Sequence, residues 1–190
     1  MRCLSNLEPV TARELFKNQQ RKEYWNYASG YYTLPSMMEY EALYKLKTHN
    51  IIPDNAIIIN GQTGDYISGG HIPRSLIDKG TSSHDLIESI IDKHYSVWKN
   101  IKFHNNFSII RNKILHTLRL EDNVTLSSDR IAAYYEFWEW QGRQSMAVIN
   151  GQRLYDYHGY KWMLPLWEMS LVQFFQTVPL DLRLGQKLYI

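Results

Sequence analysis

The pattern of apolar and polar positions predicts a chain built mainly from helices. Thr11 and Glu14 form a capping-box pattern, so a first helix is expected from there to about Tyr24, with a packed aromatic loop over 24–32 after it. A second helix is expected to open at Pro35 and to end near residue 50. Its expected apolar face consists of Met38, Ala42, Leu43 and Leu46.

Helical spacing also dominates the second half of the chain. Ser82 and Asp85 form a capping-box pattern that starts one helix, and Ser128 is placed to cap a long one. A last helix is expected over about 167–176, where Pro179 ends it. The expected apolar faces are Leu86, Ile87, Ile90, Ile91, Tyr95 and Trp98, then Phe107, Ile110, Ile114, Leu115 and Leu118, then Ile131, Ala132, Tyr135 and Trp138.

One stretch has the character of a strand. The three β-branched residues of 57–59 follow a turn-forming Pro-Asp-Asn sequence and predict a short buried strand of a parallel sheet. Residues 150–151 predict a turn, and 154–160 a short extended segment. Since one strand cannot form a sheet, its partners are expected from misassigned segments, from another chain or from sequence that is absent. The fold class is α/β and predominantly helical.

A glycine-rich loop follows this strand and carries the main site signal. Gly61, Gly64, Gly69 and Gly70 surround Asp65. In open α/β sheets, ligands bind where the carboxyl ends of strands meet such loops. Glycine lets the backbone approach a phosphate closely, and an adjacent aspartate can hold Mg²⁺. The structural alternative is a simple turn in which Asp65 accepts hydrogen bonds from backbone amides.

Composition narrows the class of protein. The chain has 190 residues, of which 44% are hydrophobic, so a single globular domain is expected. Its net charge of +2 and its scattered basic residues give no nucleic-acid footprint. The single cysteine, Cys3, fits a reducing compartment, and no apolar stretch is long enough to span a membrane. We therefore expect a cytoplasmic protein without nucleic-acid or membrane partners.

Several stretches resemble the asparagine synthetase family in the order in which that family has them. Residues 61–70, Gly-Gln-Thr-Gly-Asp-Tyr-Ile-Ser-Gly-Gly, resemble its second nucleotide motif. Residues 142–147, Gly-Arg-Gln-Ser-Met-Ala, are similar to its Asp-Arg-x-Ser-Met-Ala segment. Residues 164–168 are similar to its Val-Pro-Phe-Leu-Asp segment, while 178–180 and 185–188 are similar to the Leu-Pro segment and the segment with the active-site lysine.

The resemblance implies carboxylate activation by ATP with Mg²⁺. A small-molecule carboxylate would form an acyl-adenylate with release of pyrophosphate, and ammonia or an amine would then displace AMP. It implies that Asp65 binds the metal, that the loop glycines cradle phosphate and that Lys187 neutralises the growing charge. It also implies an adenine-nucleotide alpha-hydrolase-like fold, in which a parallel sheet is flanked by helices.

The chain departs from the family pattern at named positions. Ser68 is followed by two glycines, but Ile72 and Pro73 stand where the first motif, Ser-Gly-Gly-x-Asp-Ser, needs Asp-Ser. Residues 1–190 are thus expected to form one incomplete synthetase domain without that motif and without the glutaminase domain. Gln62 stands where an acid is common, and an amide can orient a substrate but cannot act as a base. Tyr66 replaces a second acid.

Two functions follow as hypotheses. The first is an ATP-dependent amide-forming ligase domain. The second is a non-catalytic fragment or subunit that keeps the fold and binds a partner chain. Because a lone parallel strand exposes backbone on both edges, association with itself or with a missing N-terminal part is expected.

The histidines do not form a metal-binding motif. Among His71, His84, His94 and His104 no pair has the i, i+4 spacing of a helical site, and no cysteine joins them. Surface or loop positions are expected for these residues. His71 and Arg74 follow the glycine loop and are candidates for weak phosphate contacts.

Overall fold

A computed structural model describes residues 17–30, 33–97 and 104–190. For His104 it describes the backbone only. These residues are mostly helical and include a two-stranded parallel sheet. The chain divides into two compact units. The first unit contains the described residues up to Gly61 and Gln144–Pro165, and the second contains Gln62–Arg143 and Leu166–Ile190.

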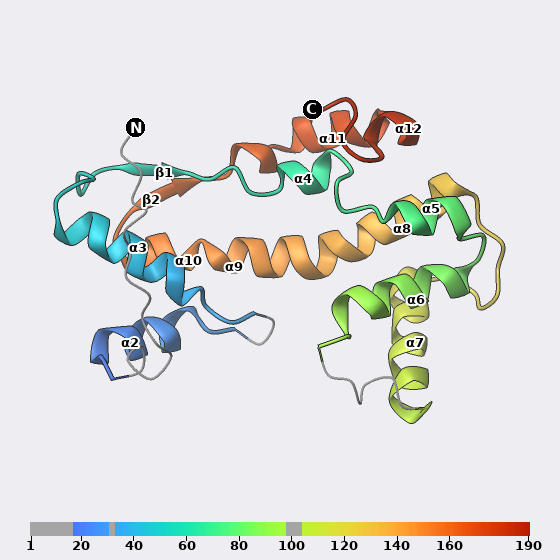
Figure 1. Cartoon of the computed structure of the whole chain (residues 1–190), viewed down its shortest axis with the longest axis horizontal. Helices are drawn as coiled ribbons and strands as arrows, with labels where there is room; N and C mark the ends of the chain where they lie inside the picture. The colour runs from blue at the N-terminus through green and yellow to red at the C-terminus, as the bar shows by residue number, and fades with distance from the viewer. Residues whose placement is uncertain (1–16, 31–32, 98–103) are drawn as a thin grey trace. The chain divides into compact units, whose positions relative to one another are not determined.

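The first unit packs short helices against a small sheet. Tyr24 and Tyr40 stack in its core with ring centroids 4.6 Å apart, next to Leu154 and Tyr160. Its elements are α2 (Gln19–Ala28), α3 (Met37–Thr48), β1 (Ile57–Ile59), α9 (Ile149–Gly151), α10 (Arg153–Tyr157) and β2 (Lys161–Met163), as Figure 1 shows. A π-helix, η2 (Trp140–Val148), crosses the boundary between the units.

Helix α2 corrects the prediction of an aromatic loop. Its N-cap is Asn18, whose side chain accepts hydrogen bonds from two backbone amides, and the helix continues through Tyr24 to Ala28. The aromatic residues lack a helical period because they pack against rings from several elements, Tyr24 against both Tyr40 and Tyr157. The capping-box pattern at Thr11 lies outside the described residues.

Helix α3 confirms a predicted helix and part of its predicted face, in which Leu43 is buried. Ser36 is the N-cap, and its side chain accepts a hydrogen bond from the Glu39 amide. Met38 is 84% exposed, so its assignment to the apolar face was wrong. The buried face includes a charged residue instead, Glu41, which forms an ion pair with Arg21. The buried positions of α3 are Met37, Tyr40, Glu41 and Leu43.

The sheet contains the predicted strand and a partner from another place. β1 pairs with β2 in parallel, with Ile58 opposite Trp162. The expectation of a buried strand was wrong, because Ile57 and Ile59 are 53% and 69% exposed. Residues 154–160 were also misassigned: they belong mainly to helix α10, the turn expected at 150–151 is part of helix α9, and the second strand begins only at Lys161.

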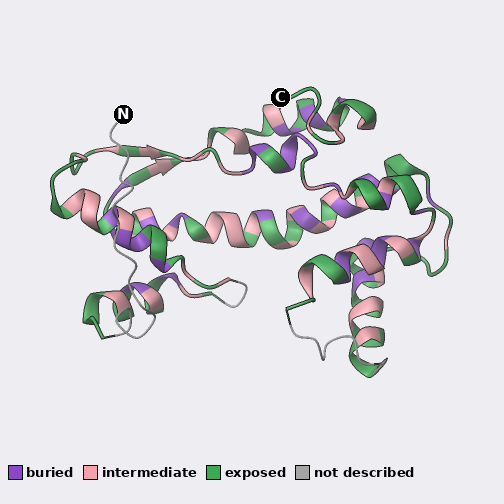
Figure 2. Ribbon diagram, in the orientation of Figure 1, coloured by how far each residue is buried: buried purple, intermediate pink, exposed green. Residues whose placement is uncertain are grey.

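The second unit has an aliphatic core between helices. Leu86, Ile87, Ile90 and Ile91 are fully buried, and Ile114 and Ile131 pack against them (Figure 2). The elements are α4 (Gly64–Ile67), α5 (Arg74–Lys79), α6 (Ser83–His94), α7 (His104–Leu118), α8 (Ser128–Glu139), α11 (Met169–Thr177) and α12 (Leu180–Arg183). A 3-10 turn, η3 (Pro165–Trp167), precedes α11.

The helix boundaries of the second unit lie close to their predicted positions. The capping box of Ser82 and Asp85 is formed at the start of α6, with both reciprocal hydrogen bonds present. Helix α8 is capped by Ser127, one residue before the predicted cap. The last predicted helix is confirmed as α11, which ends before Pro179, and the short α12 after Pro179 was not predicted. The expected core position of Trp98 lies outside the described residues.

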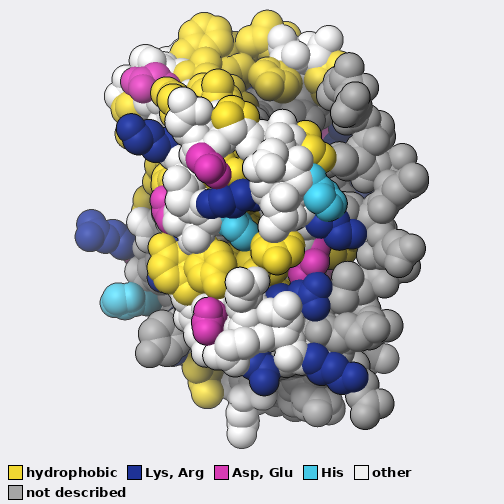
Figure 3. Space-filling view, turned by 90° about the vertical axis from the view of Figure 1, so that its left-hand side faces the viewer, with side chains coloured by type: hydrophobic (Ala, Val, Ile, Leu, Met, Phe, Trp, Pro, Cys, Tyr) yellow, Lys and Arg dark blue, Asp and Glu magenta, His cyan; other side chains and the backbone are white. Residues whose placement is uncertain are grey.

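The surface mixes charge and apolar groups. On the face that Figure 3 draws, the described Lys and Arg side chains are interspersed with acidic, histidine and hydrophobic ones. Within 17–30, 33–97 and 104–190, none of the helices combines the length and the apolar character that crossing a bilayer requires.

Candidate functional site

The glycine loop connects β1 to the one-turn helix α4. The ladder extends one residue beyond the strand, where the Asn60 amide donates to the Met163 carbonyl at 3.0 Å. Thr63 then adopts a left-handed conformation with φ of 82°, and α4 begins at Gly64. Asp65 therefore lies in the first turn of a helix that follows the carboxyl end of a parallel strand.

Two loop glycines are required by close packing within the second unit. Gly69 has a φ of 89°, and a Cβ there would lie 2.6 Å from the carbonyl oxygen of Arg183. A Cβ on Gly70 would lie 2.8 Å from Cδ of Gln186. The C-terminal segment thus occupies the space that the missing side chains leave.

The other two predicted glycines differ from each other. A Cβ on Gly64 would lie 2.8 Å from Leu166 and 3.1 Å from the Tyr189 hydroxyl. Gly61 has no such neighbour within 4 Å among the described residues. Of the four glycines that were predicted to cradle phosphate, Gly61 has the open surroundings that such a contact needs.

The C-terminal segment returns to the loop through one hydrogen bond. Gln186 Nε2 donates to Ser68 Oγ at 2.7 Å, and Ser68 Oγ in turn donates to the Gly64 carbonyl at 2.6 Å. The neighbouring Lys187 is exposed, and its ammonium forms no ion pair with a described residue. Two segments that are more than 100 residues apart in the sequence, Gly64–Gly70 and 185–188, therefore meet in one unit.

A buried carboxylate, Glu139, lies at the centre of a charged cluster near this loop. Its side chain is fully buried, and three basic side chains surround it. His71 Nδ1 lies 2.9 Å from Glu139 Oε2, while Lys93 Nζ and His94 Nε2 lie 2.9 Å and 2.7 Å from Oε1. Such pairing is what a buried carboxylate requires in order to remain ionised.

His71 connects this cluster to Asp65. Its Nε2 lies 2.8 Å from Asp65 Oδ2, so each ring nitrogen faces a carboxylate oxygen. The other Asp65 oxygen, Oδ1, accepts a hydrogen bond from the Tyr66 amide at 2.9 Å. The Asp65 side chain is 61% exposed, whereas that of His71 is 9% exposed. Arg143 adds positive charge here, with Nη1 3.1 Å from His71 Nε2.

The surroundings favour the ionised form of both carboxyls. Burial by itself would raise the pKa of Glu139, but the hydrogen bond from His71 and the close approach of His94 and Lys93 outweigh it and hold that pKa far below its ordinary value. Burial likewise opposes ionisation of Asp65. The hydrogen bond and charge of His71, the Tyr66 amide and the charge of Arg143 lower its pKa nevertheless.

Tyr66 has a structural role in place of the second acid of the family motif. Its hydroxyl donates to the Glu136 carbonyl at 3.0 Å, and the residue is 7% exposed. Burial raises its pKa above the ordinary range, so the phenol stays neutral. Gln62 lies in the turn before α4 and is half-buried, which is compatible with the orienting role that the resemblance implies.

The fit to Mg²⁺ rests on a single carboxylate. The described residues contain no group of three or more His, Cys, Asp and Glu side chains arranged to hold a metal ion. Mg²⁺ is commonly bound by one or two carboxylates together with phosphate oxygens and water. Asp65, which is exposed and ionised, fits that pattern.

Sequence reasoning missed most of the charged cluster. His71 lies in a turn, as a surface or loop histidine was expected to, but its side chain is only 9% exposed, and that of His94 is 13% exposed, because both pair with Glu139. The signal lay in α8. Ile131, Tyr135 and Glu139 follow each other at a spacing of four on the buried face of one helix. A glutamate that continues an apolar stripe must find basic partners.

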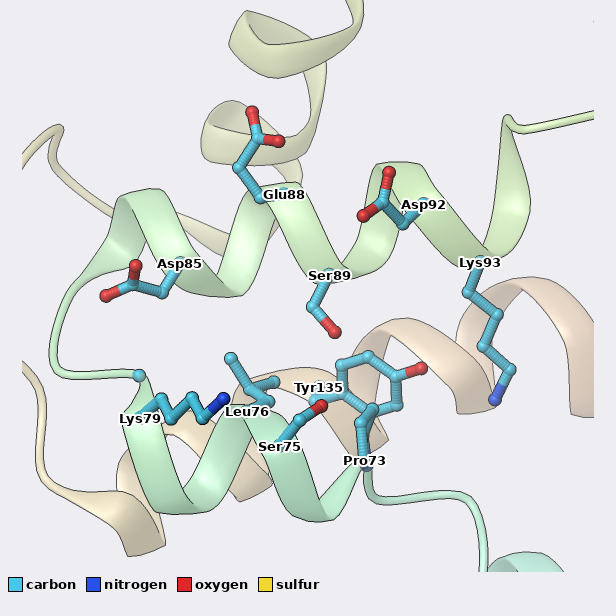
Figure 4. A pocket seen from close by; sticks show the side chains of 11 residues that line it. Pro73, Ser75, Leu76, Lys79, Asp85, Glu88, Ser89, Asp92, Lys93 and Tyr135 are labelled. Carbon is cyan, nitrogen blue, oxygen red and sulfur yellow. The ribbon is translucent and has the colours of Figure 1, made fainter.

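Two cavities adjoin these residues within the second unit. One of about 520 Å³ lies between α5, α6 and α8, and Lys93 is in its wall. Figure 4 shows Lys79 and Ser89 pointing into this space and Glu88 pointing away from it. The other, of about 530 Å³, borders α4 through Tyr66 and is lined mainly by apolar groups. The second cavity puts a space of small-molecule size beside the helix that carries Asp65.

Comparison with protein-family models, with curated proteins and with solved structures finds no match.

Proposed function

We propose that this chain is part of an ATP-dependent, amide-forming ligase of the asparagine synthetase-like kind. The observation that carries the proposal is the meeting of the two predicted site segments. The Gln186–Ser68 hydrogen bond joins the segment with Lys187 to the turn with Asp65. The resemblance needs both segments at one site, and it was stated from residues far apart in the sequence.

The proposed chemistry assigns a separate role to each group. A carboxylate oxygen of the substrate attacks the α-phosphorus of ATP, and the bond to the pyrophosphate oxygen breaks. Ammonia or an amine then attacks the acyl carbon, AMP leaves with the electron pair of the broken C–O bond, and one proton is lost. Asp65 would hold the Mg²⁺ that neutralises pyrophosphate, and Lys187 would add a second positive charge.

The local geometry supports a role for Asp65 in binding a cation. Its carboxylate is ionised, exposed and restrained on both oxygens by hydrogen bonds. Gln62 is not placed as a base in this scheme because an amide does not titrate near neutral pH. The cavity beside α4 offers room for an organic carboxylate or for the amine.

Two observations favour the non-catalytic alternative. Gly64, Gly69 and Gly70 face the chain's own Leu166, Arg183 and Gln186, so packing alone accounts for three of the loop glycines. In the first unit, the sheet residues Ile57, Ile59 and Met163 are each more than half exposed. Exposed apolar strands of this kind favour association with a partner chain.

Carboxylate-dependent release of pyrophosphate from ATP by the complete gene product tests the proposal. We expect Asp65→Asn to lower that rate roughly a hundredfold or more, on the scale of one lost electrostatic contact. Asp129→Asn is the matched control, because Asp129 is an exposed aspartate in the first turn of α8. A normal rate in Asp65→Asn would show that Asp65 does not have the proposed role, and no release with any carboxylate would favour the non-catalytic alternative.

A further inference from the structure

The Asp65 carboxylate is restrained although most of it is exposed. Exposed aspartates ordinarily exchange between staggered rotamers. Here Oδ1 accepts from the Tyr66 amide at 2.9 Å, and Oδ2 lies 2.8 Å from His71 Nε2. Two partners on different oxygens, the adjacent amide and a side chain from the turn after α4, select one direction for the carboxylate.

His71 is itself restrained by the core. Its side chain is 9% exposed, its ring meets the edge of Tyr66 at a centroid distance of 5.8 Å, and its second nitrogen lies 2.9 Å from Glu139. Glu139 is fully buried at the end of α8 and is fixed by Lys93 and His94 as well. A continuous series of contacts therefore runs from the core of the unit to the exposed carboxylate.

We infer that His71, which Glu139 holds in place, is a positioning residue for Asp65. The contact of Nδ1 with Glu139 fixes the His71 ring, and Nε2 of the fixed ring then holds Asp65 Oδ2. The free lone pairs of Asp65 face solvent in one orientation, ready for a cation. This inference deepens the proposed function and rests on it for the identity of that cation, whereas the orientation of Asp65 does not depend on it. Residues that form hydrogen bonds with a metal ligand usually orient that ligand for the metal.

Two substitutions of His71 separate its two contacts. The Gln amide can place its nitrogen where Nε2 lies, so His71→Gln retains a donor for Asp65. The shorter Asn amide reaches the position of Nδ1, so His71→Asn retains a donor for Glu139 and loses the one for Asp65. His84→Asn is the control, because His84 is exposed on α6.

The rotamer of Asp65 is the first readout and needs no enzymatic activity. Three-bond couplings to the Asp65 carboxyl carbon, measured by NMR, report whether χ1 occupies one rotamer or averages. We expect one rotamer in the unaltered chain, in His84→Asn and in His71→Gln, and averaging in His71→Asn. Averaging of χ1 in the unaltered chain, or a single rotamer in His71→Asn, would overturn the inference. The measurement on the unaltered chain tests it even if a variant is too unstable for study.

The Mg²⁺ dependence of pyrophosphate release is the second readout. His71→Asn should raise the Mg²⁺ concentration for half-maximal rate by about 10- to 100-fold and should change kcat less. This is the usual effect of removing a residue that forms a hydrogen bond with a metal ligand. His71→Gln should restore most of the affinity. If the rotamers behave as expected but ATP is not used, the proposed function fails and the positioning stands. If ATP is used and His71→Asn has a normal Mg²⁺ dependence, the positioning role is wrong.

Discussion

Replacing Glu139 with alanine should destabilise the second unit strongly. The carboxylate is fully buried and is shared by His71, Lys93 and His94. Its removal leaves three basic groups close together without their counter-charge. Lys93 is the most exposed of them and can turn toward water, whereas the two histidines are largely buried.

The expected cost follows from this arrangement. Removing one partner of a buried ion pair costs about 3–5 kcal/mol, and the free energy of unfolding of a domain is only about 5–15 kcal/mol. Glu139→Gln keeps the shape and one acceptor but loses the charge, so a smaller loss of about 1.5–3 kcal/mol is expected. Glu121→Ala, at an exposed glutamate, should change the free energy by about 0.5 kcal/mol or less.

Urea denaturation followed by circular dichroism measures these differences at neutral pH. The pKa of Glu139 is lowered in the folded state, so its contribution is present above the ordinary glutamate range and is lost as the pH falls toward the folded-state value. The gap between the unaltered chain and Glu139→Gln should accordingly narrow in acid. A Glu139→Ala variant as stable as Glu121→Ala, or a gap that widens in acid, would refute the reasoning.

Other predictions concern the loop and association. Gly69→Ala should lower the free energy of unfolding by about 1–3 kcal/mol, because φ is 89° and Arg183 is in the way, whereas Gly61→Ala should change it by about 0.5 kcal/mol or less. Equal urea midpoints for these two variants would contradict the packing described. The exposed sheet residues predict that the chain associates at micromolar concentration, and a stable monomer in analytical sedimentation would count against this. In pyrophosphate release by the complete gene product, Gln62→Ala should retain more activity than Asp65→Asn, and the reverse order would make the assignment of roles in this loop wrong.

The sequence predicted the elements whose signals are local. The capping box of Ser82 and Asp85, the helix after Ser36 and the strand at Ile58 depend on short-range hydrogen bonds and side-chain shape, and all are present. The end of helix α2, after Tyr24, was missed because its aromatic residues pack in several directions and leave no helical period. The second strand was missed because three residues give too short a pattern to distinguish from a loop.

The candidate site likewise contains residues with a local sequence signal and residues that only tertiary packing brings together. Asp65 and the glycines were found because spacing along the chain carries their signal. His71, His94 and Glu139 come from separate elements, and the charge that unites them depends on how α6 and α8 pack. A periodicity argument registers Glu139 only as a misplaced charge on an apolar face. Its partners become visible when the tertiary contacts are known.

The central claim is that the Gly64–Gly70 turn, which carries Asp65, and the Lys187 segment bind magnesium pyrophosphate together. Amide chemical-shift mapping of the isotopically labelled chain, with magnesium pyrophosphate as the probe, tests this most directly. We predict saturable shifts that are confined to 61–70 and 185–188 and that are lost in Asp65→Asn. No saturable shift, or shifts centred on the cavity between α5 and α6, would contradict it.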